Sequence, residues 1–292
     1  MFGIIILNEI EYAKDLIESG AKDKDPYSYI PILSKYYRQI LKYTPKKTAN
    51  EIDSFMTTNY INYNSVRWVA FIDSCVKKSK KQKLSNIQFV GVTQKELDII
   101  DSSTQNTTHA KVLFSLLCVA KYFNVRSETN NNWTNLKTKD IFRMANVNTS
   151  IEKQDRIIHE LYKSSSIGIS KKVDNLNIRV LCVDNTTDFV LQIGDFRNLG
   201  YEYMNWKKGG YFRCAECGAL QKQNKYGNRI YCNKCVGNSP MLSKTIKCVD
   251  CGREFKIDSK DNQTDHCPEC YKKYRAEKNK EKYRKYNVKR RA

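Results

Sequence analysis

The sequence is poor in glycine, proline and histidine, and it lacks the common phosphate-binding and hydrolytic motifs. Only 12 of its 292 residues are Gly, 5 are Pro and 3 are His, whereas ~7% Gly is usual. It contains no G-x-x-x-x-G-K loop, no HExxH helix and no paired-carboxylate motif. We therefore predict no catalytic residues, no enzymatic activity and no small-molecule substrate.

Long apolar runs are also absent. The longest extends from Val112 to Ala120 and includes Ser115, which is far short of the ~20 residues that span a membrane as a helix. The opening segment, MFGIIILNEIEYAKD, has no basic stretch and acquires acidic residues early, unlike a secretory signal. We therefore expect a cytoplasmic protein without a membrane partner.

Positive charge is abundant and unevenly distributed. The chain has 51 Lys and Arg against 31 Asp and Glu, a net charge of +20. Residues 207–292 hold 23 basic and 9 acidic side chains, a net charge of +14, and residues 271–292 alone carry +9. A block of like charge is typical of an interaction surface, so we predict DNA or RNA as a partner.

Eight of the eleven cysteines form four CxxC pairs. The pairs are Cys214/Cys217, Cys232/Cys235, Cys248/Cys251 and Cys267/Cys270. Fourteen residues separate the first two pairs and fifteen the last two, which is the spacing of zinc ribbons. Four copies disfavour a redox motif. We predict two Zn²⁺ per chain, both structural, because four thiolates leave no ligand position open for water.

The two halves of this region look like a repeat. Cys214 and Cys248 are 34 residues apart, as are Cys217 and Cys251, and Gly218 and Gly252 each follow the second cysteine. A glycine there suits a left-handed turn. The repeat favours sequential pairing into two ribbons, with a cross-brace between alternate pairs as the alternative.

The cysteine region and the tail supply candidate nucleic-acid contacts. In the first ribbon they are Lys222, Lys225 and Arg229, and in the tail Lys272, Lys273, Arg275, Lys278, Arg284, Lys285, Arg290 and Arg291. Tyr226, Tyr231 and Phe255 are either stacking platforms or fillers of small cores. The tail is either a basic helix extending from the second ribbon, with Tyr271 and Tyr274 on one face, or a segment that orders on binding. An acidic protein surface is the other possible partner of the tail.

Residues 108–193 show the order of a winged helix-turn-helix. We expect helices at 108–124, 139–145 and 149–163, the first buried and the third opened by a Thr149-Ser-Ile-Glu152 capping box, followed by a hairpin around residues 174–175. The candidate contacts are Lys153, Arg156 and Lys163 on the third helix and Lys171 and Lys172 near the hairpin tip. Two acids on that helix leave open a protein-docking scaffold instead.

The first third reads as helical. Helices are expected at 27–43 and 66–77, with capping boxes at Thr48–Glu51 and Thr93–Glu96. The predicted fold class is mainly α with small β. It comprises a helical domain (1–105), a winged helix (106–200), zinc ribbons (205–238 and 244–270) and a basic tail (271–292).

The segments KDIFRMANVNTS, KKVDNLNIRV and FRCAECG…YCNKC resemble proteins of phages and prophages of low-GC Gram-positive bacteria. These pair a winged helix with carboxyl-terminal four-cysteine ribbons, and the likeness covers about Thr108 to Cys270. It implies a phage-encoded replication or transcription factor in the host cytoplasm. The alternative is a protein that docks on a host nucleic-acid-handling or defence complex and inhibits or redirects it.

Overall fold

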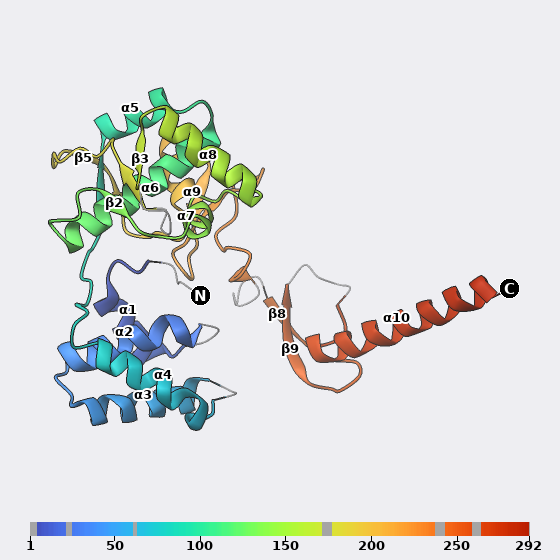
Figure 1. Ribbon diagram of the computed structural model, residues 1–292. Helices are drawn as coiled ribbons and strands as arrows, with labels where there is room; N and C mark the ends of the chain where they lie inside the picture. Colours follow the sequence, from blue (N-terminus) through green and yellow to red (C-terminus); the bar gives the residue numbers. More distant parts are fainter. Residues whose placement is uncertain are drawn as a thin grey trace. The chain divides into compact units, whose positions relative to one another are not determined.

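The computed structural model describes residues 5–21, 25–60, 63–170, 177–236, 243–258 and 264–291 (Figure 1). The chain divides into two compact units. Unit 1 is Met1–Gly209 and unit 2 is Gly210–Ala292. The described residues form ten helices and nine short strands, so the predicted mainly α class with small β is confirmed.

Four helices of unit 1 enclose the first of its two apolar cores. They are α1 (Glu9–Ser19), α2 (Pro26–Gln39), α3 (Pro45–Asn59) and α4 (Ser65–Lys78). Each begins after a residue whose side chain accepts a hydrogen bond from a backbone N–H of the first turn: Asn8, Asp25, Thr44 and Asn64. Leu16, Tyr29, Leu33, Ile52 and Met56 are fully buried between them.

The capping box predicted at Thr48–Glu51 is wrong. Helix α3 begins one turn earlier, because Thr44 accepts from the Lys47 N–H at 3.2 Å and Pro45 occupies the first helical position, where its fixed φ suits a helix start. Thr48 therefore lies inside the helix, fully buried.

The second core surrounds α6 (Thr107–Arg126), whose middle turns are buried on all sides as predicted. The helices packed with it are α5 (Gln94–Ser103), α7 (Thr138–Met144), α8 (Ile151–Lys163) and α9 (Leu199–Lys208). The capping box at Thr93–Glu96 is present and opens α5. The capping box predicted at Thr149–Glu152 is wrong, because α8 begins after Ser150, whose side chain makes no capping hydrogen bond.

Two small sheets complete unit 1. In the first, β2 (Trp133–Thr134), β4 (Ile178–Val180) and β3 (Ile167–Ile169) lie in the order β2-β4-β3. The predicted hairpin is confirmed, with Gly168 opposite Arg179 in the antiparallel pair β3–β4. The second sheet consists of β5 (Phe189–Ile193) and β1 (Val90–Thr93), which are antiparallel and far apart in the sequence. The tip residues Lys171 and Lys172 lie outside the described residues.

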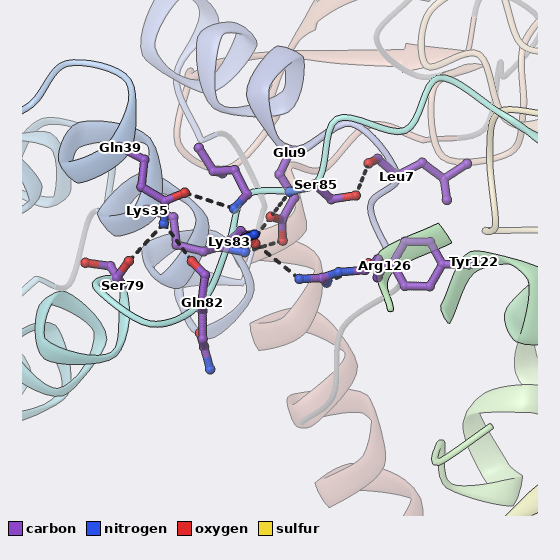
Figure 2. A network of polar contacts seen from close by, with 11 residues as sticks. Leu7, Glu9, Lys35, Gln39, Ser79, Gln82, Lys83, Ser85, Tyr122 and Arg126 are labelled. Carbon is purple, nitrogen blue, oxygen red and sulfur yellow. Dashed lines mark hydrogen bonds and ion pairs between the residues drawn. The ribbon is translucent and has the colours of Figure 1, made fainter. Parts of the chain in front are cut away.

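A polar network joins the segment after α4 to helices α1 and α2 and to the end of α6 (Figure 2). Lys35 Nζ lies 2.5 Å from Glu9 Oε1, and Glu9 Oε2 accepts from the Ser85 N–H at 2.8 Å. At the end of α6, Arg126 donates to the carbonyl of Lys83 at 3.1 Å. Burial of Lys35 lowers the pKa of its ammonium group, although the neighbouring carboxylate of Glu9 opposes this effect.

Unit 2 consists of two hairpins and a long helix. Strand β6 (Tyr211–Arg213) pairs with β7 (Leu220–Lys222), and β8 (Ser243–Lys247) with β9 (Glu254–Asp258). Helix α10 (Pro268–Arg291) follows (Figure 1). Among the helices described, none has both the length and the apolar character needed to cross a membrane.

Candidate metal centres and basic surface

The first CxxC of each half lies at the tip of a hairpin. In the first half, Arg213 pairs with Leu220 and the Cys214 N–H donates to the carbonyl of Ala219 at 3.0 Å. The second half repeats this 34 residues later, because Lys247 pairs with Glu254 and the Cys248 N–H donates to Arg253 at 2.9 Å. The strand pair therefore fixes where each turn projects its thiols.

A left-handed glycine closes each turn, as the sequence predicts. Gly218 has φ 68° and Gly252 has φ 69°, a region that side chains with a Cβ rarely occupy. The Gly218 N–H donates to the carbonyl of Cys214 at 2.8 Å, and the Gly252 N–H to that of Cys248 at 2.9 Å. The two turns are equivalent in conformation and in hydrogen bonding.

The second CxxC of each half is brought to the first by a backbone hydrogen bond just before it. Ala215 donates to the carbonyl of Ile230 at 2.9 Å, and Val249 to that of Asp265 at 3.0 Å. The thiols then form two groups, in each of which all sulfur atoms lie within 4.8 Å of one another: Cys214, Cys217, Cys232 and Cys235, and Cys248, Cys251, Cys267 and Cys270. The grouping is the sequential one that the repeat predicts, and the cross-brace is not formed.

The spacing of the sulfur atoms suits one zinc ion in each group. Four sulfurs about 2.3 Å from a central zinc ion lie about 3.8 Å apart in a tetrahedron. The Sγ atoms of Cys217 and Cys232 are 3.8 Å apart, and those of Cys251 and Cys267 are 3.7 Å apart. Each group could therefore hold one metal ion, and a full set of four thiolates is the donor set of structural zinc sites.

Backbone N–H groups stabilise one thiolate in each group. Burial raises the pKa of Cys214, but N–H donors led by that of Cys217 outweigh burial and lower the pKa to about 6. In the second group the N–H of Cys267 is the main cause of a pKa of about 6 at Cys248. The pKa of Cys270 is raised instead, to about 12, by hydrogen bonding with Cys267 and Cys251. A bound cation would displace such shared protons.

The remaining cysteines belong to unit 1 and are buried. Burial raises the pKa of Cys75 to about 11 and that of Cys182 to about 12, and it raises the pKa of Cys118 strongly as well. None of the three is part of either four-cysteine group, so they act as packing residues.

The predicted contacts near the first group are solvent-facing. Lys222 and Lys225 are exposed and Arg229 is half-buried. Tyr226 is 80% exposed, whereas Tyr231 and Phe255 are half-buried. Two further exposed cations, Lys247 and Arg253, lie beside the second turn and were not among the contacts predicted from the sequence. Their positions on either side of the Cys248/Cys251 pair could have identified them.

The predicted helical form of the tail is the one observed. Helix α10 begins at Pro268, so Cys270 lies in its first turn. The predicted contacts whose side chains are described are all exposed: Lys272, Lys273, Arg275 and Lys278. Arg284, Lys285, Arg290 and Arg291 continue the same helix. The second four-cysteine group and the basic residues of α10 are therefore adjacent in the chain.

Three of the nucleic-acid contacts predicted for unit 1 lie on α8. Lys153, Arg156 and Lys163 are all exposed, on a helix whose exposed acids include Glu152 and Asp155. The net charge of α8 is close to zero, in contrast to α10.

No family model, curated protein or solved structure was found to match this chain.

Proposed function

We propose that this chain is a zinc-dependent nucleic-acid-binding protein without catalytic activity, and that it acts as a phage-encoded replication or transcription factor. Each four-cysteine group holds one Zn²⁺, and the basic side chains of unit 2 contact phosphates. The observation that carries the proposal is the coincidence of two complete four-thiol groups with a net charge of +14 in residues 207–292.

The small apolar content of unit 2 supports a structural role for the metal. Both apolar cores draw all their residues from unit 1. Of the seven buried residues described in unit 2, four are cysteines of the two groups: Cys214, Cys232, Cys248 and Cys267. A segment with so little core needs another source of stability, and zinc–thiolate bonds supply it in domains of this size.

The element order in unit 1 supports a second contact region of winged-helix type. Helices α6, α7 and α8 are followed by the β3–β4 hairpin, and β2 adds a strand beside β4. In that fold the third helix reads the major groove, which here assigns the contacts to Lys153, Arg156 and Lys163. Two of the three segments that resemble phage proteins, KDIFRMANVNTS and KKVDNLNIRV, belong to this part of the sequence.

The test compares two full-length variants with the same change of charge. The first carries Lys272→Gln, Lys273→Gln, Arg275→Gln and Lys278→Gln on α10. The control carries Lys77→Gln, Lys78→Gln, Lys80→Gln and Lys81→Gln, which are exposed lysines of unit 1. Affinity is measured by fluorescence anisotropy between 50 and 200 mM salt (about the range in which phosphate contacts are revealed).

The α10 variant should weaken binding and flatten the salt dependence by ~0.7–0.9 per lost phosphate contact, whereas the control should match the wild type. Equal slopes in all three proteins, or no binding by the wild type, would contradict the proposal.

The mixed charge of α8 favours a second candidate, a protein that docks on a host nucleic-acid-handling or defence complex. Three acids, Glu152, Asp155 and Glu160, offset its three basic residues, which suits a protein surface better than a phosphate backbone. Affinity purification after nuclease treatment tests this candidate. One stoichiometric protein partner, lost on reversing the charges of α8, would support it over the first.

A further inference from the structure

We infer that the amino-terminal end of α10 is a stacking site for an unpaired base, so that the protein prefers single-stranded to duplex nucleic acid. The inference rests on the proposed function and names its ligand class. It comes from a row of three rings, Tyr271, Tyr274 and His266, beside the second four-cysteine group.

The rings form a short ordered row. The ring centroids of Tyr271 and Tyr274 are 6.4 Å apart with planes inclined at 32°, and Tyr274 stacks on His266 at 5.2 Å and 28°. His266 is held in turn by the carboxylates of Asp250, at 3.4 Å, and Asp265. The row is therefore oriented before any ligand binds, which lowers the entropy cost of stacking.

Tyr271 is the open end of this row. It is 51% exposed, and among the described residues Tyr274 is its one ring neighbour. Tyr274, at 40% exposure, is covered from a second direction by Lys278, whose Nζ lies 5.1 Å from its ring centroid. An incoming base accordingly meets Tyr271 first, while Tyr274 and His266 support it.

Cations follow the rings along the same helix face. Tyr271, Tyr274, Arg275 and Lys278 are spaced i, i+3, i+4 and i+7, so they form one stripe, about 10 Å long at 1.5 Å per residue. Arg275 and Lys278 are exposed. A strand whose base stacks on Tyr271 can therefore place its following phosphates against these two side chains.

Packing against a second copy of α10 does not explain the exposed rings. The stripe contains no aliphatic residue, and a helix of net charge +9 over residues 271–292 would meet another of equal sign. A polyanion with aromatic faces satisfies both the rings and the charge.

Base stacking discriminates between single strands and duplex. Every unpaired base offers a π-face, whereas in a duplex each face is covered by its neighbours and must be unstacked first. Phosphate contacts occur in both forms. Loss of one stacking ring should weaken single-strand binding by about 5- to 150-fold and leave duplex binding nearly unchanged.

The experiment uses the full-length, zinc-loaded protein and three fluorescent ligands of one sequence: single-stranded DNA, single-stranded RNA and duplex DNA. Tyr271→Leu removes the π-face but keeps an apolar side chain, and Tyr271→Phe keeps the π-face. We expect the wild type and Tyr271→Phe to bind both single strands more tightly than duplex. Tyr271→Leu should lose at least about 5-fold on the single strands and less than about twofold on duplex.

A photocrosslink provides a readout on the unmutated protein. A single strand carrying 5-iodouracil should crosslink to Tyr271, as identified by peptide mass spectrometry. Crosslinks confined to other segments, or equal losses of Tyr271→Leu on strands and duplex, would overturn the stacking site while leaving the proposed function standing. Failure of the wild type to bind any of the three ligands would overturn both.

Discussion

The backbone N–H of Cys232 donates to Sγ of Cys214 at 3.2 Å. The equivalent bond in the second half, from Cys267 to Cys248, is 3.3 Å long. Each bond joins the two CxxC pairs of its own group, so the backbone already sets which cysteines act together. The repeat in the sequence is thus a repeat in hydrogen bonding.

Zinc content should follow this grouping. The wild type should contain two zinc ions per chain by elemental mass spectrometry, and Cys214→Ser or Cys248→Ser should each lower the value to about one, since each group lacks a spare ligand. Cys75→Ala is the control, because Cys75 is outside both groups. A value near one in the wild type would contradict two complete sites.

Thiol reactivity should fall into two classes. In a brief alkylation pulse at pH 8, the zinc-loaded protein should show no labelling. After a chelator the eight clustered cysteines should react, while Cys75, Cys118 and Cys182 stay protected, because burial raises the pKa of each. Intact-mass spectrometry counts the labels, and all eleven should appear in denaturant. Labelling of any of these three before denaturation would show that unit 1 opens on metal loss.

Acid stability should depend on Asp101, which ties α5 to α9. Burial raises the pKa of Asp101, but hydrogen bonds from Lys207 (2.7 Å) and Tyr203 outweigh it, so the pKa is lowered. The carboxylate therefore stabilises the fold above its unfolded pKa of ~3.9, and this contribution is lost as the pH falls through the lowered folded value.

Asp101→Asn should accordingly reduce the free energy of unfolding by at most about 1 kcal/mol at pH 7, since the pair is partly exposed. The difference from the wild type should shrink as the pH drops to about 3. Urea titrations at several pH values measure it. Asp73→Asn is the control, because Asp73 is exposed and makes no hydrogen bond or ion pair within the described part of the chain. A difference independent of pH would refute the role of the carboxylate charge.

Gly200 should be intolerant of any side chain. A Cβ at this position of α9 would lie 1.8 Å from the carbonyl oxygen of Ala145 and 2.7 Å from Cε of Lys111. Gly200→Ala should therefore cost about 1–3 kcal/mol of unfolding free energy, measured by urea denaturation. Gly168→Ala, whose Cβ would meet Arg179 at an ordinary 3.7 Å, should be near neutral, and similar losses in both variants would contradict a specific clash.

Local signals in the sequence predicted much of this structure. The CxxC turns with Gly218 and Gly252, the buried helix α6 and the hairpin β3–β4 each depend on residues close together in the chain, where spacing carries the information. The start of α3 is misplaced because Thr48 has the capping-box partner Glu51, whereas Thr44 is followed three residues later by Lys47; Pro45 is the signal for the true start.

Long-range pairings could not be predicted in the same way. Strand β1 meets β5 across about a hundred residues, and periodicity does not specify such a partner. The Glu9–Lys35 pair and its bond to Ser85 likewise join segments with no common motif. In the candidate site, the stacking of His266 on Tyr274 was not predicted. The two residues are eight positions apart, and their contact follows only from the start of α10 at Pro268.

The start of α10 inside the second four-cysteine group has a consequence for regulation. Cys270 is both a thiol of that group and a residue of the first helical turn, and Tyr271 follows it directly. A zinc ion held there would anchor the helix and set the direction of the aromatic row. Occupancy of the ion and affinity for a strand would then be thermodynamically linked, so that each ligand tightens the other. Under the proposed function, the free zinc concentration of the cell becomes an effector of binding.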